Sequence, residues 1–438
     1  MASKMSRRSF LKKSAASAAA VGFSLVGAPA IGQPGGVIEN INIGIIGCGG
    51  RGTSLLRNLV RRSQDPKNKI KVVAVCDVYK PRLERAQQIC GGKAFIEYRD
   101  MLQMPDLDAV VIATPDHWHA KMAIDSMEAG KDVYLEKPMT LYWEEAKQVH
   151  QTRLRTNRVV QIGAQSASQP RYWRGREVIE NGLIGHKIIS TCCYDRNVPG
   201  GDWNYHIDPN CSPENLDWER WLGPAPKRPF SKERFFRFRK YWDYSGGLAT
   251  DLLYHALAHT MIALGPEFPT RVVATGGIFL HQDERSGNPV REVPDTFQFY
   301  ADYPTEHTVA GFATAGNTNS VQEKIRGEWA TIKWEGKGVR VYPEPKFKKE
   351  WLALAKEKYP DDVKVPEEPK AMPSLELGGI NGGDHMQIWL DCIRTRKQPT
   401  LDTEAGYKVM VTIALSVLSY RQNKVMLFDP EKEELITT

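Results

Sequence analysis

After residue 40, short apolar runs alternate with longer mixed stretches, a pattern that predicts strands separated by helices. Residues 42–46, 71–76 and 109–113 are rich in β-branched and aliphatic side chains, which is typical of strands buried on both faces of a parallel sheet. A fourth strand is expected over residues 132–135, with a helix between the last two. Farther along, residues 296–303 and 308–314 favour neighbouring strands of one large sheet.

Two polar segments come directly after predicted strands, where ligands sit in open parallel sheets. The first is Thr-Pro-Asp-His-Trp-His at residues 114–119, and the second is Glu-Lys-Pro at residues 136–138. Pro138 fixes its own backbone and biases Lys137 away from helix, so this lysine is held at a strand end. Lys137 is therefore a candidate for chemistry, and a solvated surface lysine is the alternative.

A glycine-rich sequence follows the first predicted strand directly. Its glycines fit the pattern Gly-x-Gly-x-x-Gly, in which they permit a tight turn, the close approach of a pyrophosphate and helix packing. The candidate cofactor-binding residues of this loop are Gly47, Gly49, Gly50, Arg51 and Gly52. A helix over residues 53–60 would direct its N-terminus at the phosphate.

Asp77 ends the second predicted strand. An acidic residue there hydrogen-bonds a ribose 2′-hydroxyl and repels a 2′-phosphate, so NAD is the expected cofactor. NADP is the alternative, because Lys80 and Arg82 lie nearby and could receive a phosphate. A purely structural role for Asp77 is that of a helix N-cap.

Asp251, His255 and His259 recur every four residues in an otherwise apolar segment. A helix that begins near Asp251, capped by Thr250, would place all three on one face. Because buried charges need partners, the three side chains either satisfy one another in the core or line a cavity. A metal site that also recruits Asp116, His117 and His119 is a minority interpretation, and we expect no metal.

The first thirty residues carry three features of an export signal in order. They are Ser-Arg-Arg-Ser-Phe-Leu-Lys at residues 6–12, an apolar stretch over residues 15–26 and Ala-Pro-Ala at residues 28–30. The sequence therefore predicts a twin-arginine signal peptide over residues 1–30, use of the twin-arginine export machinery and a periplasmic or secreted protein. The apolar stretch is too short to span a membrane, and a disordered basic tail is the alternative.

The composition, with 41% hydrophobic and 25% charged residues, is that of a globular protein. The net charge of +7 lies partly in the leader, and no basic block interleaved with aromatic residues is long enough to predict nucleic-acid binding. The richest such block, residues 234–240, could equally bind an acidic group of a substrate.

The glycine motif, the acidic strand end, Ala-Thr-Pro at residues 113–115 and Glu-Lys-Pro occur in an order that resembles the glucose–fructose oxidoreductase/inositol dehydrogenase/MocA family. The resemblance implies an α/β fold, with a Rossmann dinucleotide-binding domain over residues 38–165. It also implies an α/β domain with a large, mostly antiparallel open sheet over residues 166–438, and a homodimer or homotetramer. Within the second domain we expect a surface insertion at residues 342–373 and helices returning over the core at residues 384–438.

The same resemblance implies roles for individual residues. Thr114, Pro115, His119, Glu136 and Lys137 would line the nicotinamide half of the cofactor site. His255 would be the general base on a sugar hydroxyl, Asp251 would orient or tune it, and Lys137 would polarise the oxygen. Arg196, Trp203 and His259 are candidate substrate residues. Many relatives have an acidic residue three positions after the histidine, whereas this chain has Ala258, which puts the proton path in question.

The predicted function is that of an NAD(P)-dependent oxidoreductase acting on a sugar, a sugar derivative or a cyclitol. Because free NAD is expected to be scarce outside the cytoplasm, the export signal favours a tightly bound cofactor that is recycled within the protein. One alternative is a glycosidase or lyase that works by transient oxidation of a glycoside, and another is a metal-dependent lyase or hydrolase of keto-sugars. A non-catalytic sugar-binding protein is a third alternative, against which the intact Lys137, Asp251 and His255 argue.

Overall fold

The first part of the fold is a parallel sheet with strand order β3-β2-β1-β4-β5-β6. The computed structural model describes residues 39–198, 200–280, 291–368 and 371–436, and the predicted signal peptide lies outside them. The strands are β1 (Ile41–Ile46), β2 (Ile70–Cys76), β3 (Lys93–Phe95), β4 (Ala109–Ile112), β5 (Asp132–Leu135) and β6 (Val160–Ile162). Every pairing is parallel, so the carboxyl ends of the strands meet at one edge.

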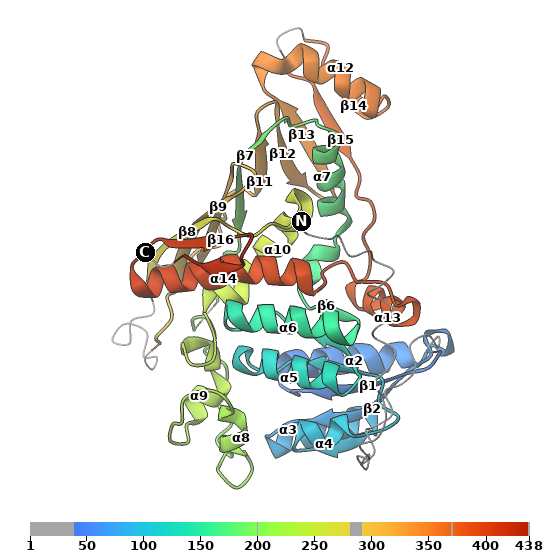
Figure 1. Ribbon diagram of the computed structural model, residues 1–438, viewed down its shortest axis with the longest axis vertical. Helices are drawn as coiled ribbons and strands as arrows, with labels where there is room; N and C mark the ends of the chain where they lie inside the picture. The colour runs from blue at the N-terminus through green and yellow to red at the C-terminus, as the bar shows by residue number, and fades with distance from the viewer. Residues whose placement is uncertain (1–38, 199, 281–290, 369–370, 437–438) are drawn as a thin grey trace, which may run out of the picture. The chain divides into compact units, whose positions relative to one another are not determined.

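Helices cover both faces of this sheet (Figure 1), and its central strands are therefore buried on both sides. One face packs against α2 (Gly50–Ser63), α3 (Lys80–Cys90) and α13 (His385–Thr395). The other face packs against α4 (Tyr98–Leu102), α5 (Asp116–Glu128) and α6 (Trp143–Thr156). The helix expected from residue 53 begins earlier, at Gly50, with Gly49 as its extended cap residue.

The second sheet has the strand order β14-β15-β13-β12-β11-β7-β10-β9-β8-β16-β17. Its strands are β7 (Lys187–Cys193), β8 (Arg271–Gly277), β9 (Thr296–Tyr303), β10 (His307–Thr314), β11 (Lys324–Gly327), β12 (Ala330–Glu335), β13 (Gly338–Pro343), β14 (Val363–Lys364), β15 (Ser374–Leu377), β16 (Met426–Asp429) and β17 (Glu434–Leu435). Among the described strand pairings of this second sheet, only that of β7 with β10 is parallel. The mostly antiparallel sheet predicted from the sequence is confirmed.

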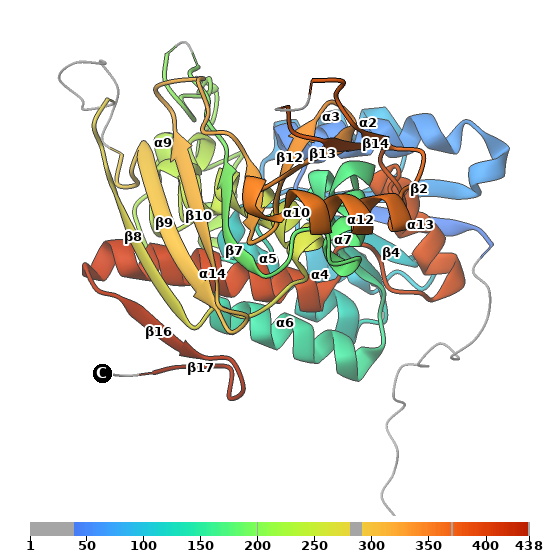
Figure 2. The same ribbon diagram turned by 90° about the horizontal axis from the view of Figure 1, so that it is seen from above.

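One face of the second sheet is covered by α7 (Pro170–Glu180), α10 (Tyr254–Leu264) and α14 (Thr403–Gln422) (Figure 2). Helix α14 also packs against α6, so a single hydrophobic cluster joins both sheets. On the opposite face, the paired residues Val273 and Tyr300 are exposed. The homodimer or homotetramer that the family resemblance implies stays a prediction.

The described part of the expected surface insertion at residues 342–373 is mostly exposed, and it also contributes to the core. They contain η5 (Pro345–Phe347) and α12 (Lys348–Lys358), and β14 extends the second sheet. Trp351 and Ala355 of α12 are fully buried in the main hydrophobic cluster. The Lys- and Glu-rich composition concealed this packing, because α12 buries only one narrow face.

The remaining elements are short. They are η1 (Pro66–Asn68), η2 (Gln165–Ser168), α8 (Trp218–Leu222), α9 (Lys232–Phe236), η3 (Phe238–Lys240) and the π-helical turn η4 (Ala249–Leu253). In the part of the chain that the structure describes, no helix is both long enough and apolar enough to cross a bilayer.

Candidate active site

The glycine-rich loop joins β1 to α2 at the carboxyl edge of the first sheet. Gly47 has a φ of +88°, and a Cβ there would lie 2.7 Å from the Ala113 carbonyl oxygen. A Cβ on Gly52 would lie 1.8 Å from the Gly47 carbonyl oxygen, so α2 can pack this closely only with glycine at that position. The loop thus has the tight turn and the close helix approach that dinucleotide binding requires.

A cavity of about 880 Å³ opens beside this loop. Most of the predicted cofactor-binding residues line it, namely Gly47, Gly49, Gly50, Arg51, Asp77, Thr114, Pro115, Glu136 and Lys137. The Asp77 carboxylate accepts the N–H of Cys48 at 2.7 Å and that of Tyr79 at 2.9 Å, and burial raises the pKa of Asp77. The lining fits a dinucleotide, since the loop offers backbone to a pyrophosphate and Asp77 offers an acceptor to a ribose hydroxyl.

The two other predicted cofactor-binding residues, Gly52 and His119, do not line the cavity. The buried His119 ring has Nδ1 2.6 Å from the Pro138 carbonyl oxygen and Nε2 3.0 Å from the Thr114 carbonyl oxygen. Because α5 turns this side chain into the core, His119 does not line the cavity, and its expected place at the nicotinamide half stays a prediction. His119 instead joins the loop after β4 to the turn that carries Lys137.

The first residues of α5 fasten two more segments that are distant in sequence. Thr250 Oγ1 donates to Asp116 Oδ2 at 3.1 Å, and burial raises the pKa of Asp116. Trp118 Nε1 donates to the Trp221 carbonyl oxygen at 2.8 Å, and His117 Nε2 lies 3.1 Å from the same oxygen. These side chains hold the cavity wall together.

Residues 205–239 cross the open side of the cavity, and we call this segment the roof. Its lining residues are Tyr205, His206, Asp208, Arg220, Trp221, Phe235, Phe236, Phe238 and Arg239. A β-bridge joins Tyr79 to Leu216, and the Tyr79 hydroxyl donates to Asp208 Oδ2 at 2.7 Å. Tyr79, Trp221 and Phe235 share one buried cluster. The second domain therefore builds a large part of the cavity wall.

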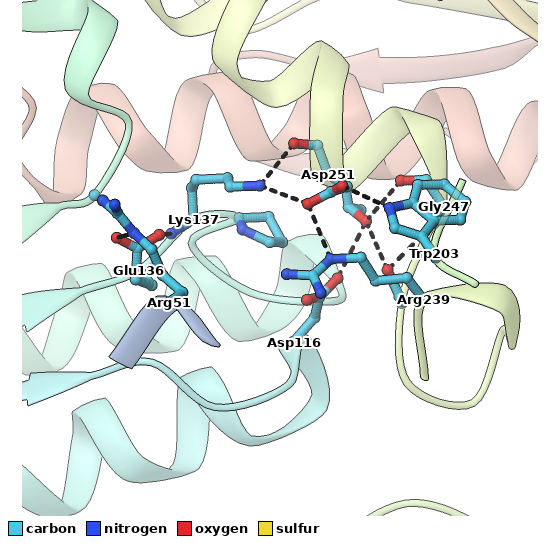
Figure 3. Close-up of polar contacts among 12 residues, drawn as sticks. Arg51, Asp116, Glu136, Lys137, Trp203, Arg239, Gly247 and Asp251 are labelled. Atoms are coloured by element: carbon cyan, nitrogen blue, oxygen red, sulfur yellow. Dashed lines mark hydrogen bonds and ion pairs between the residues drawn. The ribbon is translucent and has the colours of Figure 1, made fainter. Parts of the chain in front are cut away.

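Asp251 is the centre of the polar network at the Lys137 end of the cavity (Figure 3). Its Oδ1 accepts from Lys137 Nζ at 2.6 Å and from Arg239 Nε at 3.0 Å. Its Oδ2 accepts from Trp203 Nε1 at 2.9 Å and from Arg196 at 3.3 Å. Burial opposes ionisation, but Arg239 and Lys137 hold the pKa of Asp251 well below its usual range.

This network changes the role expected of Asp251. Both of its oxygens are taken by cations and an indole, so the carboxylate positions Lys137. It also acts on His255, whose pKa it raises against the larger effect of burial. Lys137 Nζ also donates to the Asp251 carbonyl oxygen at 2.7 Å. The side chains of Lys137 and Asp251 are 12% and 9% exposed, so the pair is largely shielded from water. Arg196 and Trp203 contact Asp251, and their expected role toward a substrate stays a prediction.

His255 follows Asp251 across a change of helix type. The π-helical turn η4 ends at Leu253 and α10 begins at Tyr254, which corrects the helix predicted to begin near Asp251 with Thr250 as its cap. In the described part of the chain no hydrogen bond engages the His255 ring, which lies 6.1 Å from the Tyr194 ring. Burial and the Lys137 cation hold the pKa of His255 well below its usual value. The ring is therefore neutral and able to accept a proton.

His259, the third member of the predicted face, has partners of its own. Its Nε2 lies 3.1 Å from Glu323 Oε1 and its Nδ1 lies 3.1 Å from Ser166 Oγ. The ring stacks on Tyr172 at a centroid distance of 4.2 Å. Within the described residues, no group of three or more His, Cys, Asp or Glu side chains is placed to hold a metal ion.

The site residues predicted individually from the sequence did not include Arg239, Glu323 or the roof residues that line the cavity. The basic and aromatic block at residues 234–240 was a signal for the roof, since Phe235, Phe236, Phe238 and Arg239 all line the cavity. No local pattern marked Glu323, which reaches His259 from the segment before β11.

Comparison with known proteins agrees with this geometry. A family model described as "Oxidoreductase family, NAD-binding Rossmann fold" matches residues 41–164. The model of the same family's C-terminal α/β domain matches residues 174–275. The chain belongs to this family. It is the glucose–fructose oxidoreductase/inositol dehydrogenase/MocA family of oxidoreductases, so the first domain is an NAD-binding Rossmann domain.

Curated relatives match parts of the chain. The scyllo-inositol 2-dehydrogenase (NAD(+)) of Bacillus subtilis is 30% identical over 189 residues, which cover 42% of this chain and 54% of that protein. The α-N-acetylgalactosaminidase of Shewanella oneidensis is 33% identical over 171 residues, which cover 36% of this chain and 35% of that protein. A glycosyl hydrolase family 109 protein from Shewanella is 33% identical over 144 residues, with 30% of each chain covered. The chain thus spans only about a third to a half of the length of these relatives.

A solved structure of levoglucosan dehydrogenase in complex with NADH superimposes with a TM-score of 0.64. The two chains are 18% identical, and the match covers 88% of this chain and 98% of the other. The shared fold therefore extends over both domains.

Proposed function

We propose that this protein oxidises a hydroxyl group of a sugar, a sugar derivative or a cyclitol, and that its NAD stays bound between the two half-reactions. One observation carries the proposal: Lys137, held by Asp251, lines a dinucleotide-sized cavity to which the roof also contributes, and the Lys137 cation acts on the neutral His255.

The side chains of the site supply what alcohol oxidation needs from a protein. NAD, when bound, supplies the hydride acceptor. The neutral ring of His255 takes the proton of the substrate hydroxyl. The charged Lys137 Nζ, held 2.6 Å from Asp251 Oδ1, stabilises negative charge on the substrate oxygen. In the reverse half-reaction the same histidine returns the proton.

The roof supports retention of the cofactor. The bridge between Tyr79 and Leu216 and the aromatic cluster behind it fasten the roof to the first domain beside the cavity. The predicted twin-arginine leader supports the same conclusion, because a protein acting in the periplasm or outside the cell has little free NAD to draw on. A recycled cofactor also requires a second, oxidised carbohydrate or a redox-neutral reaction.

The carbohydrate class of the substrate is supported by relatives. One is named scyllo-inositol 2-dehydrogenase, and one structural neighbour is named levoglucosan dehydrogenase. A second candidate function, NAD-dependent cleavage of a glycoside through transient oxidation, is favoured by the relatives named α-N-acetylgalactosaminidase and glycosyl hydrolase family 109 protein. Oxidation of a ring carbon acidifies the neighbouring C–H bond, and elimination of the glycosidic oxygen leaves an unsaturated ketone. Water then adds to its double bond, and return of the hydride gives the free sugar.

The test is to denature the purified protein and identify the released nucleotide by absorbance and mass. Stoichiometric NAD or NADH supports a retained cofactor, whereas a protein that is empty and inactive without excess NAD contradicts retention. The two candidates are then separated by their products on a panel of cyclitols, free sugars and N-acetylgalactosaminides. An oxidoreductase gives a ketone, and a glycosidase gives a free sugar with no net change in the nucleotide.

A further inference from the structure

Arg239 connects the roof to the Lys137–Asp251 pair. It lies in η3 at the end of the roof, and its side chain lines the cavity. Its Nε donates to Asp251 Oδ1 at 3.0 Å, and Lys137 Nζ donates to the same oxygen at 2.6 Å. One carboxylate oxygen is thus shared by a cation from the edge of the first sheet and a cation from the roof (Figure 3).

The backbone around Asp251 makes this shared contact important. Asp251 lies in the π-helical turn η4, and such turns are uncommon and occur frequently at functional sites. Burial raises the pKa of Asp116, and the nearby Arg239 cation acts in the opposite direction and lowers it. It therefore stands between an acidic residue of the first domain and the carboxylate that holds Lys137.

We propose that Arg239 is a positioning residue through which closure of the roof over the cofactor sets the Lys137–Asp251 pair for catalysis. The inference rests on the proposed function. While the roof covers the cavity, Arg239 fixes Asp251 and Asp251 fixes Lys137. The site is therefore set where the roof lies over the cavity and Arg239 contacts Asp251.

Arg237 provides a matched control. It lies in the same segment, but its Nη1 pairs with Glu233 at 3.0 Å and its Nε donates to the Tyr205 carbonyl oxygen at 2.8 Å. Both partners belong to the roof. Arg237→Gln therefore removes an arginine and two contacts from the roof without touching Asp251.

The experiment is hydrogen–deuterium exchange on the full chain, with the bound nucleotide removed and NADH then added back as the probe. In the unmodified protein, NADH should slow exchange both in the roof and in the peptide that contains η4. In Arg239→Gln, NADH should still slow exchange in the roof, but the factor by which it slows exchange in the η4 peptide should be about tenfold smaller. This is the loss expected for one charged hydrogen bond. Arg237→Gln should keep the slowing in η4, and Arg239→Lys should restore part of it.

Each result is decisive. Equal protection of η4 by NADH in the Arg239→Gln and unmodified proteins would overturn the inference. If Arg239→Gln fails to fold, Arg239→Lys decides, because full protection of η4 with lysine in place of the guanidinium would also overturn it. If NADH slows exchange in neither the roof nor the glycine-rich loop of the unmodified protein, the cofactor assignment itself fails.

Discussion

Removing Asp251 should lower the free energy of unfolding much more than removing Lys137. Asp251→Asn keeps the size of the side chain but removes the anion that faces Lys137, Arg196 and Arg239. Lys137→Met keeps the apolar stem and leaves Asp251 with two arginines and the indole of Trp203. The first change removes the carboxylate from Lys137 and Arg239, while Arg196 keeps Asp202 at 2.9 Å. The second change removes one of the four side-chain donors to Asp251.

The magnitudes follow from the shielding of the pair. Leaving buried charges without their counter-ion costs about 3–5 kcal/mol, so Asp251→Asn should lower the free energy of unfolding by that amount. Loss of one charged hydrogen bond from a carboxylate that retains other donors costs about 1–2 kcal/mol, which is the expectation for Lys137→Met. Both variants should lose the reduction of bound NAD by substrate.

Urea unfolding of the nucleotide-free proteins at pH 7 measures the difference, and the nucleotide must be removed because a bound ligand adds its own stabilisation. The pKa of Asp251 is depressed in the folded state. Its contribution is therefore complete above the unfolded value of about 4 and is lost as the pH falls through the folded value. The difference in free energy of unfolding between Asp251→Asn and Lys137→Met should therefore become smaller at low pH. A Lys137→Met protein that is destabilised as much as Asp251→Asn would refute the description of Asp251 as the centre of the network.

Three further outcomes are expected. His255→Gln should lower the rate of NAD reduction at least about 100-fold while nucleotide stays bound. Because the pKa of His255 is depressed in the unmodified protein, the rate of that protein should be constant above a pH of about 6.5 and fall only at acidic pH. An acid limb that persists in the variant would assign the base elsewhere. Gly52→Ala should cost at least about 3 kcal/mol of stability, measured by urea unfolding, because its Cβ meets backbone, whereas Gly50→Ala, with nothing within 4 Å, is the matched control. Tyr79→Phe removes the hydrogen bond to Asp208 and should speed NADH dissociation about tenfold in a fluorescence chase, and an unchanged rate would mean that this edge of the roof does not retain the nucleotide.

The local sequence was sufficient for the elements and for the cofactor loop. Buried strands such as β4 and β5 follow from short apolar runs, and the glycines of the loop are required by contacts between neighbouring backbone segments. Such strands and this glycine motif are marked by residues close together in the chain, so one sequence is enough to predict them.

The arrangement of the site was less accessible to sequence reasoning. Spacings of four in Asp251, His255 and His259 assume a continuous α-helix, whereas η4 is a π-helical turn, and each side chain finds different neighbours. The partners of Asp251 and His259 come from segments far away in the chain, as Arg239 and Glu323 show. Such pairings depend on tertiary packing, which no helical period reports.

The most direct test of the account is to mix the purified protein, with no nucleotide added, with each carbohydrate of the panel and to follow the near-ultraviolet absorbance of reduced nicotinamide. The account predicts a rise that stops at one equivalent per site, is reversed by an oxidised sugar, and disappears in Lys137→Met and His255→Gln. A rise that requires added NAD, or one that survives in Lys137→Met, would contradict the central claim that Lys137 and His255 oxidise a carbohydrate with a retained cofactor.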